Sequence, residues 1–185
     1  NNVIAEMLAT AMGGHTVVAQ KAASAAGIPL DEIRLINGSG LGQQNQISPH
    51  AVVALLIALQ NRARSLNLTL ADLLPVSDCK CGTIEDRDMP PGALVKTGTL
   101  SDVSALAGMI PTRDRGPIWF ATINRGEGNI ETFHSAQDRL LRSLNQKWGN
   151  PTALLTNSFT STPWQDTNRD RLMLSRQTLL NYRQH

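Results

Sequence analysis

The sequence has few aromatic residues, little charge of either sign and almost no cysteine. Aromatics make up 4% of its 185 residues, and charged residues make up 17%. A formal net charge of only +2 argues against nucleic acid or an anionic membrane surface as a partner. The apolar runs are too short and interrupted to span a bilayer, and no signal peptide is visible. With these classes excluded, the length and composition predict a mildly polar domain with a hydrophobic core of ordinary size.

The two cysteines, Cys79 and Cys81, are separated by one residue. A bridge between such close neighbours is strained, so the sequence favours unpaired thiols over a disulfide. The histidines show no metal-ligand spacing with one another or with the cysteines, and no metal site is predicted.

The first half of the chain has the hydrophobic spacing of helices. Helices are predicted over residues 3–12 and 17–26, the second with Gly27 as its C-cap. After a short strand at 33–36, Ser48-Pro49 opens a long helix, which its apolar run predicts to be buried on most sides.

The second half changes to the spacing of strands. Strands are predicted over residues 94–100, 103–110 and 118–124, the last two forming an antiparallel hairpin around a turn at 111–117. An amphipathic helix from Phe133 to Trp148 follows. This order predicts an α+β domain, an antiparallel sheet flanked by helices, over residues 1–150. Residues 151–185 form a polar tail, with a possible helix from about Thr167 to Tyr182.

The first predicted strand of this sheet contains the candidate binding segment, Lys96-Thr97-Gly98-Thr99. A lysine in an apolar strand is costly unless its ammonium reaches solvent or an anion, and a glycine in mid-strand lets a ligand backbone come close. The pattern therefore predicts an edge strand that binds an extended peptide with a free carboxylate. A chance K-T-G triplet is the bland alternative.

Other segments match in order along the chain. K-T-G occurs with S-x-x-K and S-D-N in penicillin-binding proteins. The matching segments are Asn1-Asn2-Val3-Ile4-Ala5-Glu6, the stretch after the serine of an S-x-N motif, then Asn37-Gly38-Ser39-Gly40-Leu41 with Asn45-Gln46-Ile47-Ser48-Pro49, then Leu74-Pro75-Val76 with Gly82-Thr83-Ile84, and Ser104-Ala105-Leu106-Ala107-Gly108. Together these segments resemble the penicillin-binding D-alanyl-D-alanine carboxypeptidase/endopeptidase family, the low-molecular-mass class C penicillin-binding proteins.

The resemblance implies a reaction and a set of partners. A serine would attack the carbonyl between two D-alanines of a peptidoglycan stem peptide, and water would hydrolyse the acyl-enzyme. β-Lactams would inhibit by acylating the same serine, and no metal or organic cofactor is implied. The protein would act in the periplasm or elsewhere outside the cytoplasmic membrane. The resemblance does not rank carboxypeptidase against endopeptidase activity.

It also implies roles for individual residues. Lys96 would attract the terminal carboxylate of the substrate, and Thr97 would donate its hydroxyl to it. Gly98 would leave room for the substrate backbone. Thr99 would donate its backbone N–H to the oxyanion hole, and Asn2 would hydrogen-bond the substrate near the scissile bond.

The nucleophile of the family is not among these matches. The one literal S-x-x-K, Ser77-Asp78-Cys79-Lys80, follows the S-x-N position instead of preceding it and falls in a predicted loop. We therefore expect a fragment that lacks the N-terminal strands and the nucleophile and is inactive alone. A non-catalytic peptidoglycan-binding module and an unrelated α+β domain with chance matches are the alternatives.

Several other patterns are given structural interpretations. Gly38-Ser39-Gly40-Leu41-Gly42 resembles a phosphate loop, but no helix is predicted after it, which favours a tight turn. Glu6 is interpreted as a solvated or capping carboxylate. Arg113 and Arg115 are expected at the solvated tip of the hairpin.

Overall fold

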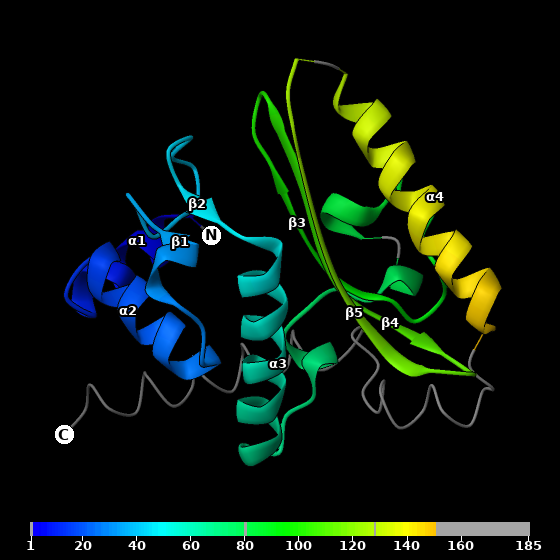
Figure 1. Ribbon diagram of the computed structural model, residues 1–185, viewed down its shortest axis with the longest axis horizontal. Helices are drawn as coiled ribbons and strands as arrows, with labels where there is room; N and C mark the ends of the chain where they lie inside the picture. The colour runs from blue at the N-terminus through cyan, green and yellow to red at the C-terminus, as the bar shows by residue number, and fades with distance from the viewer. Residues whose placement is uncertain (1, 80, 128, 151–185) are drawn as a thin grey trace, which may run out of the picture.

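The computed structural model describes residues 2–79, 81–127 and 129–150, and the predicted helix in the tail lies outside them. Two parts lie on either side of a long helix, α3 (Pro49–Ser65) (Figure 1). One part holds helices α1 (Asn2–Ala11) and α2 (His15–Ala26) with the two-residue strands β1 (Ile33–Arg34) and β2 (Gln46–Ile47). The other part is a three-stranded sheet covered by helix α4 (Ile130–Trp148).

The helix ends follow the signals in the sequence. Gly27 ends α2 in the left-handed conformation, with φ of 67°. The Ser48 hydroxyl accepts a hydrogen bond from the N–H of Ala51 at 2.9 Å, and Pro49 takes the first position of α3. The prediction that α3 is buried on most sides is wrong, since Ile57 and Leu59 are each 39% exposed. This helix packs on α2 and on the sheet, and its remaining face is open to solvent.

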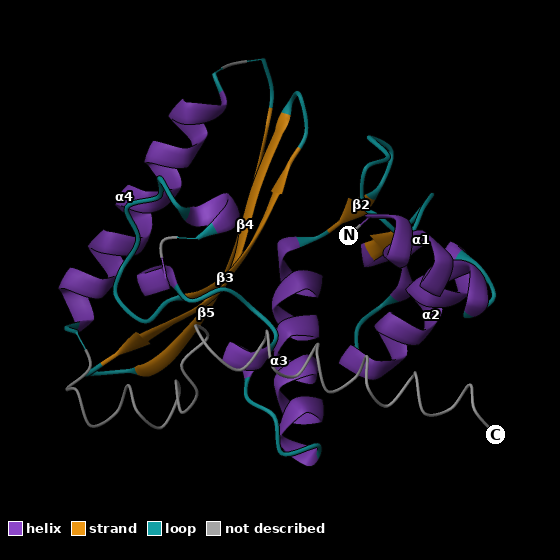
Figure 2. Cartoon of the chain, turned by 180° about the vertical axis from the view of Figure 1, so that it is seen from behind, coloured by secondary structure: helices purple, strands orange, loops and turns teal. Residues whose placement is uncertain are grey.

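The sheet is antiparallel in the order β3 (Leu94–Thr99), β4 (Val103–Thr112) and β5 (Gly116–Arg125). Its two faces have separate cores. The face toward α4 buries Val95, Leu106, Ile110 and Phe120 against Leu141. The face toward α3 contributes Leu94, Met109 and Trp119 to a second cluster with Leu56. Helices on both faces of an antiparallel sheet confirm the predicted α+β fold, and Figure 2 shows the sheet between α3 and α4.

The hairpin turn is shorter than predicted. The strands continue to Thr112 and resume at Gly116, with Pro111 paired to Pro117. Because β3 pairs with β4 only as far as Met109, no strand of the described residues lies beside Pro111 on that side, and its missing N–H leaves no ladder hydrogen bond unmade there. Arg113 lies exposed at this tip, as expected, beside Asp114.

A buried ion pair joins α4 to the loop before β3. The Arg87 guanidinium donates to both carboxylate oxygens of Asp138 at 2.7–3.1 Å and to Gln137 Oε1 at 2.9 Å. The side chains of Arg87 and Asp138 are only 5% and 8% exposed. Gln137 in turn donates to Ser104 and Asn124. This network fixes the loop from which β3 emerges.

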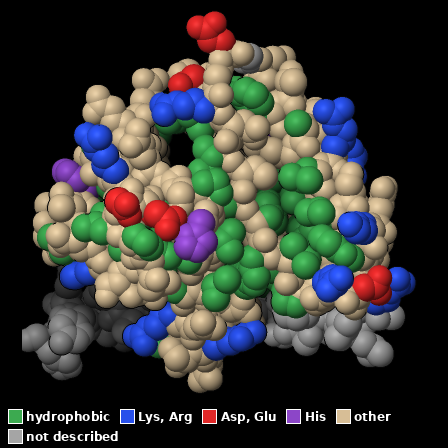
Figure 3. Space-filling view, in the orientation of Figure 1, with side chains coloured by type: hydrophobic (Ala, Val, Ile, Leu, Met, Phe, Trp, Pro, Cys, Tyr) green, Lys and Arg blue, Asp and Glu red, His purple; other side chains and the backbone are tan. Residues whose placement is uncertain are grey.

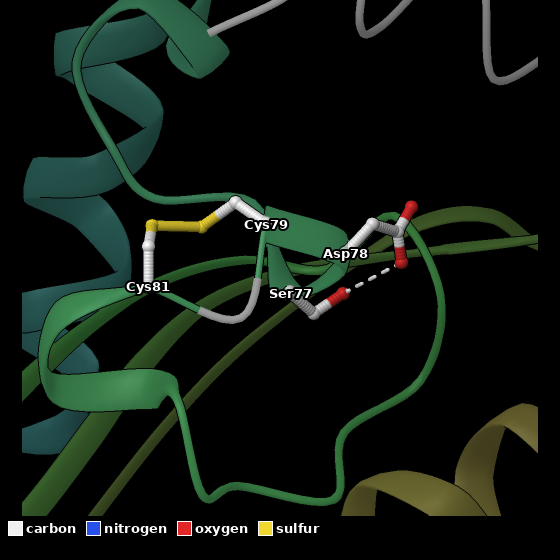
Figure 4. Close-up of a disulfide and its surroundings, with 4 residues drawn as sticks. All are labelled: Ser77, Asp78, Cys79 and Cys81. Carbon is white, nitrogen blue, oxygen red and sulfur yellow. Dashed lines mark hydrogen bonds between the residues drawn. A yellow bond between two sulfur atoms is a disulfide. The ribbon is translucent and has the colours of Figure 1, made fainter. Parts of the chain in front are cut away.

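Cys79 and Cys81 form a disulfide (Figure 4), so the prediction of unpaired thiols is wrong. Short 3-10 helices end at Cys79 and begin at Gly82, and the Cα atoms of the two cysteines are 5.3 Å apart. That separation is normal for a disulfide, which removes the objection from sequence proximity.

None of the helices in the described part of the chain is both long enough and apolar enough to cross a membrane.

Candidate active site

All the residues predicted from the sequence to form a site line one groove of about 660 Å³. They are Asn2, Lys96, Thr97, Gly98 and Thr99. The groove lies between the sheet and the glycine-rich loop that joins β1 to β2, and an opening is visible in the upper half of the space-filling view (Figure 3). Segments far apart in the sequence therefore meet at a single cavity.

Lys96 is exposed in the groove on an edge strand, as the sequence predicted. Its ammonium donates to the main-chain carbonyl of Thr97, and no ion pair with an acidic side chain is found for it among the described residues. An anionic ligand can therefore bind this ammonium without first displacing an acidic side chain from it.

The free edge of β3 presents main-chain donors. Leu100 donates its N–H to Val103, and in an antiparallel ladder only alternate residues bond to the same neighbour. The N–H of Val95 points the other way and donates to Pro75 at 3.0 Å. By the same alternation, the N–H groups of Thr97 and Thr99 point away from β4, where an added peptide strand could accept from them.

The hydroxyl of Thr97 lies 2.7 Å from the hydroxyl of Thr83, which also lines the groove. Either hydroxyl can donate, so Thr83 orients the group predicted to bind the substrate carboxylate. The sequence analysis matched Gly82-Thr83-Ile84 to the family but gave Thr83 no role. Only the folded chain brings this loop against β3.

Helix α1 forms part of the opposite wall and carries Asn2 at its start. One turn later, the Glu6 carboxylate accepts hydrogen bonds from the N–H of Gly38 at 3.0 Å and from the N–H and hydroxyl of Ser39 at 2.9 and 2.6 Å. The Ser39 hydroxyl, followed by the two N–H groups, lowers the pKa of Glu6. Glu6 thus holds the glycine-rich loop, a more specific role than the solvated or capping carboxylate expected.

The loop can lie this close to α1 because residue 38 is glycine. A Cβ there would be 2.5 Å from the Cβ of Ala9 and 2.8 Å from the carbonyl oxygen of Ala5. Gly40 has a φ of 80°, which also favours glycine. The interpretation of this stretch as a tight turn agrees with the geometry.

A bridge of polar contacts crosses the far end of the groove. Arg125, at the end of β5, donates to the carbonyl of Gln43 at 2.9 Å and to the Asp102 carboxylate at 3.2 Å. The side chain of Gln43 donates to the hydroxyl of Ser101 at 3.3 Å. Sequence reasoning missed Arg125 because nothing in its neighbourhood differs from an ordinary strand end.

Ser77, from the rejected S-x-x-K, is not among the residues that line the groove. Its hydroxyl donates to the carbonyl of Pro90 at 2.7 Å and accepts from the N–H of Ala93 at 3.1 Å. The hydroxyl therefore holds the loop before β3. Lys80 lies outside the described residues. In the described ranges, no three His, Cys, Asp or Glu side chains come close enough to hold a metal ion.

Comparison with known proteins gives a family and a fold. The model of the D-Ala-D-Ala carboxypeptidase 3 (S13) family matches residues 1–144. A search of curated proteins finds no match. Among solved structures, the predatory endopeptidase Bd0816 of Bdellovibrio bacteriovorus, in complex with immunity protein Bd3460, is 23% identical with a TM-score of 0.70. That alignment covers 82% of this chain and 42% of the other.

Two further structures have the same fold. The penicillin G acylated Bd3459 predatory endopeptidase of the same organism is 20% identical, with a TM-score of 0.72 over 83% of this chain and 44% of that one. Penicillin-binding protein 4 of Haemophilus influenzae, complexed with a β-lactam, is 24% identical, with a TM-score of 0.63 over 80% and 39%. The chain thus spans less than half the length of these proteins.

Proposed function

Since the chain belongs to the D-Ala-D-Ala carboxypeptidase 3 (S13) family, we propose that it is the carboxylate-binding part of a serine-type D-Ala-D-Ala carboxypeptidase or endopeptidase. Its substrates are peptidoglycan stem peptides that end in D-Ala-D-Ala. Because peptidoglycan lies outside the cytoplasmic membrane, so does the site of action. Residues 1–150 are the peptidase part, and residues 151–185 are a polar tail.

The observation that carries this proposal is the position of the Lys96 ammonium. It is exposed in the groove and donates to the main-chain carbonyl of Thr97, and Thr97 and Thr99 line the same groove. A terminal carboxylate is a suitable acceptor for an ammonium and a hydroxyl together, because charge-assisted hydrogen bonds are the stronger ones. The peptide then lies antiparallel along β3 as an added strand.

In this pose each residue of the site has one task. Lys96 and Thr97 hold the terminal carboxylate, and Gly98 leaves space for the peptide backbone. The N–H of Thr99 stabilises the oxyanion as the carbonyl becomes tetrahedral. Asn2 donates its amide to the peptide from the opposite wall. These tasks bind and orient the scissile bond, and the serine that attacks it is supplied from outside this chain.

The chain alone is therefore inactive. Ser39 is the one serine among the described residues that line the groove, and its hydroxyl donates to Glu6. A β-lactam is expected to leave the intact mass of the chain unchanged. A covalent adduct on the 185-residue chain, or release of D-alanine by it, would contradict this part of the proposal.

Calorimetric titration tests the binding function. Acetylated Gly-D-Ala-D-Ala with a free C-terminal carboxylate is expected to bind about tenfold or more tightly than the same peptide with a C-terminal amide, because a charged hydrogen-bonded contact is lost. Equal affinities for the acid and the amide would reject the proposal. The measurement suits the chain as it is, because it needs no nucleophile.

A non-catalytic peptidoglycan-binding module would give the same binding result. If the same gene product contains a serine in an S-x-x-K arrangement upstream of Asn1, the protein is an enzyme and not a non-catalytic binding module.

A further inference from the structure

The Cys79–Cys81 disulfide precedes a residue of the groove by a very short stretch of chain. Thr83 follows the bridge directly after Gly82, and its hydroxyl is 2.7 Å from the hydroxyl of Thr97. Both threonines line the groove. The proposed function assigns the Thr97 hydroxyl to the terminal carboxylate of the substrate and gives the disulfide no role. The bridge is thus placed to control how Thr83 is held.

The segment that carries the bridge is anchored on both sides by contacts that do not involve sulfur. Before the bridge, the Asp78 carboxylate accepts hydrogen bonds from the N–H of Gly92 at 3.1 and 3.2 Å. After it, the Ile84 side chain is 1% exposed in the core cluster on the α4 face of the sheet. Figure 4 shows the bridge at the end of the 3-10 helix Ser77–Cys79, between these two anchors.

The residues that follow the bridge have weak restraints of other kinds. Cys81, Gly82 and Thr83 are all exposed. The N–H of Ile84 donates to the carbonyl of Cys81 at 3.3 Å, at the long end of the hydrogen-bond range. A Cβ built at Gly82 would meet no atom of the described residues within 4 Å, so packing restrains this glycine little. The covalent bridge is therefore the main restraint on the position of Thr83.

Thr83 supports the contact that Thr97 makes in the proposed pose. When the Thr97 hydroxyl donates to the carboxylate, its oxygen can accept a hydrogen bond from the Thr83 hydroxyl. Hydrogen bonds in such a chain polarise and strengthen one another. A fixed Thr83 therefore prepares Thr97 to donate into the groove, and a loosened Thr83 leaves the Thr97 hydroxyl free to rotate.

One sulfur of the bridge is open to attack from solution. Cys81 is exposed, whereas Cys79 is partly buried and packs against the core cluster on the α4 face. Thiol–disulfide exchange needs access of a thiolate to one of the two sulfurs, so attack occurs at Cys81. The sequence contains two cysteines in all, and an external thiol can therefore act on this bridge alone.

We propose that this disulfide is a thiol-exchange site, and that its reduction weakens carboxylate binding by loosening Thr83. An external thiolate forms a bond to the sulfur of Cys81, the bridge breaks, and its electron pair leaves on the sulfur of Cys79, which takes a proton. A second external thiolate then bonds to the sulfur of the first. The Cys81 sulfur leaves with the electron pair and takes a proton. Two external thiols are thereby oxidised to a disulfide, and two cysteines are reduced.

The exchange gives the groove two states. The bridged state is expected in an oxidising compartment, where disulfides persist, and the reduced state is expected where thiols are in excess. The groove would then bind its substrate best outside the cytoplasmic membrane, where peptidoglycan lies. This inference rests on the proposed function, because it concerns the same carboxylate contact.

Calorimetric titration of the 185-residue chain with acetylated Gly-D-Ala-D-Ala, before and after reduction by dithiothreitol, tests the inference. The reduced chain is expected to bind about two- to tenfold more weakly, because one hydrogen bond loses its support. The double variant Cys79→Ser with Cys81→Ser should bind as the reduced chain does, with and without dithiothreitol. That control separates the bridge from other effects of the reagent.

Two variants of Thr83 test whether the response passes through its hydroxyl. Thr83→Val keeps the bridge and is expected to lose the response to reduction, whereas Thr83→Ser keeps a hydroxyl and should retain it. In nuclear magnetic resonance spectra without peptide, reduction should shift the amides of Thr83 and Thr97 and leave Phe120, in the core cluster, unchanged. These spectra decide the question if the double variant does not fold.

Three results would overturn the inference alone: equal affinity of the bridged and reduced chains, a response that survives in Thr83→Val, and shifts on reduction that extend to Phe120. If neither redox form prefers the peptide acid over its C-terminal amide, the proposed function fails as well.

Discussion

The two walls of the groove are held in different ways. The sheet is buried between apolar clusters on both of its faces, and a buried ion pair ties α4 to the loop before β3. Helix α1, on the other wall, has only Ala9 buried and exposes Val3, Met7 and Leu8 by 58–67%. The glycine-rich loop beside it is attached through the hydrogen bonds to Glu6.

This contrast separates the two tasks of the site. The sheet wall presents the Lys96 ammonium at a fixed position, which needs a rigid support, and the sheet's own apolar core provides it. The opposite wall is set by polar contacts to one carboxylate, and those contacts depend on pH. We therefore expect damage to the sheet part to unfold the protein and damage to the loop to change the groove alone.

Removal of the buried arginine is expected to have the largest effect. Arg87→Ala leaves the Asp138 carboxylate buried without its partner, and loss of one partner from a buried ion pair costs about 3–5 kcal/mol. Urea unfolding measures the free energy. Arg113→Ala is the matched control, because its ion pair with Asp114 is 61% and 46% exposed, and it should change stability by about 0.5 kcal/mol or less. Similar values for both variants would contradict a special role for the sheet part.

The close contact at Gly38 gives a smaller and more local effect. Gly38→Ala forces the loop away from α1, and overpacking of this kind costs about 1–3 kcal/mol. Hydrogen exchange should show faster opening at Ser39 and Gly40, with strand β4 unchanged. Equal acceleration in β4 would mean that the two parts unfold as one unit and that the comparison between them is wrong.

Titration of Glu6 is expected to give the smallest effect. Its pKa is lowered below the usual 4.5, so the stabilisation it provides is complete above pH 4.5 and is lost as the pH falls through the lower value in the folded protein. The amide resonances of Gly38 and Ser39 should shift over that acidic range in nuclear magnetic resonance spectra. Glu6→Gln should remove this transition, while Glu32→Gln, at a carboxylate held by Ser48 and His50, should leave it in place.

The sequence predicted those features that depend on a few adjacent residues. Gly27 and Ser48-Pro49 gave the helix ends, and Lys96 within an apolar run gave an exposed edge strand. Each of these rests on local backbone chemistry or on the cost of burying charge, and both can be evaluated along a short segment.

The features that it missed depend on contacts between distant segments. Glu6 meets Ser39 across 33 residues, and Arg125 meets Gln43 across 82. No local pattern distinguishes these from solvated charges. The prediction for Cys79 and Cys81 failed for another reason: a sequence separation of two does not by itself fix the distance between their Cα atoms, which is 5.3 Å.

The central claim is that Lys96 binds the peptide carboxylate, and chemical-shift mapping of peptide binding tests it most directly. With acetylated Gly-D-Ala-D-Ala, the amides of Thr97 and Thr99 should shift, and Lys96→Gln should weaken binding by about tenfold or more, while Lys21→Gln on α2 binds as the unmodified chain does. Undiminished binding by Lys96→Gln, or shifts confined to residues away from β3, would contradict the account.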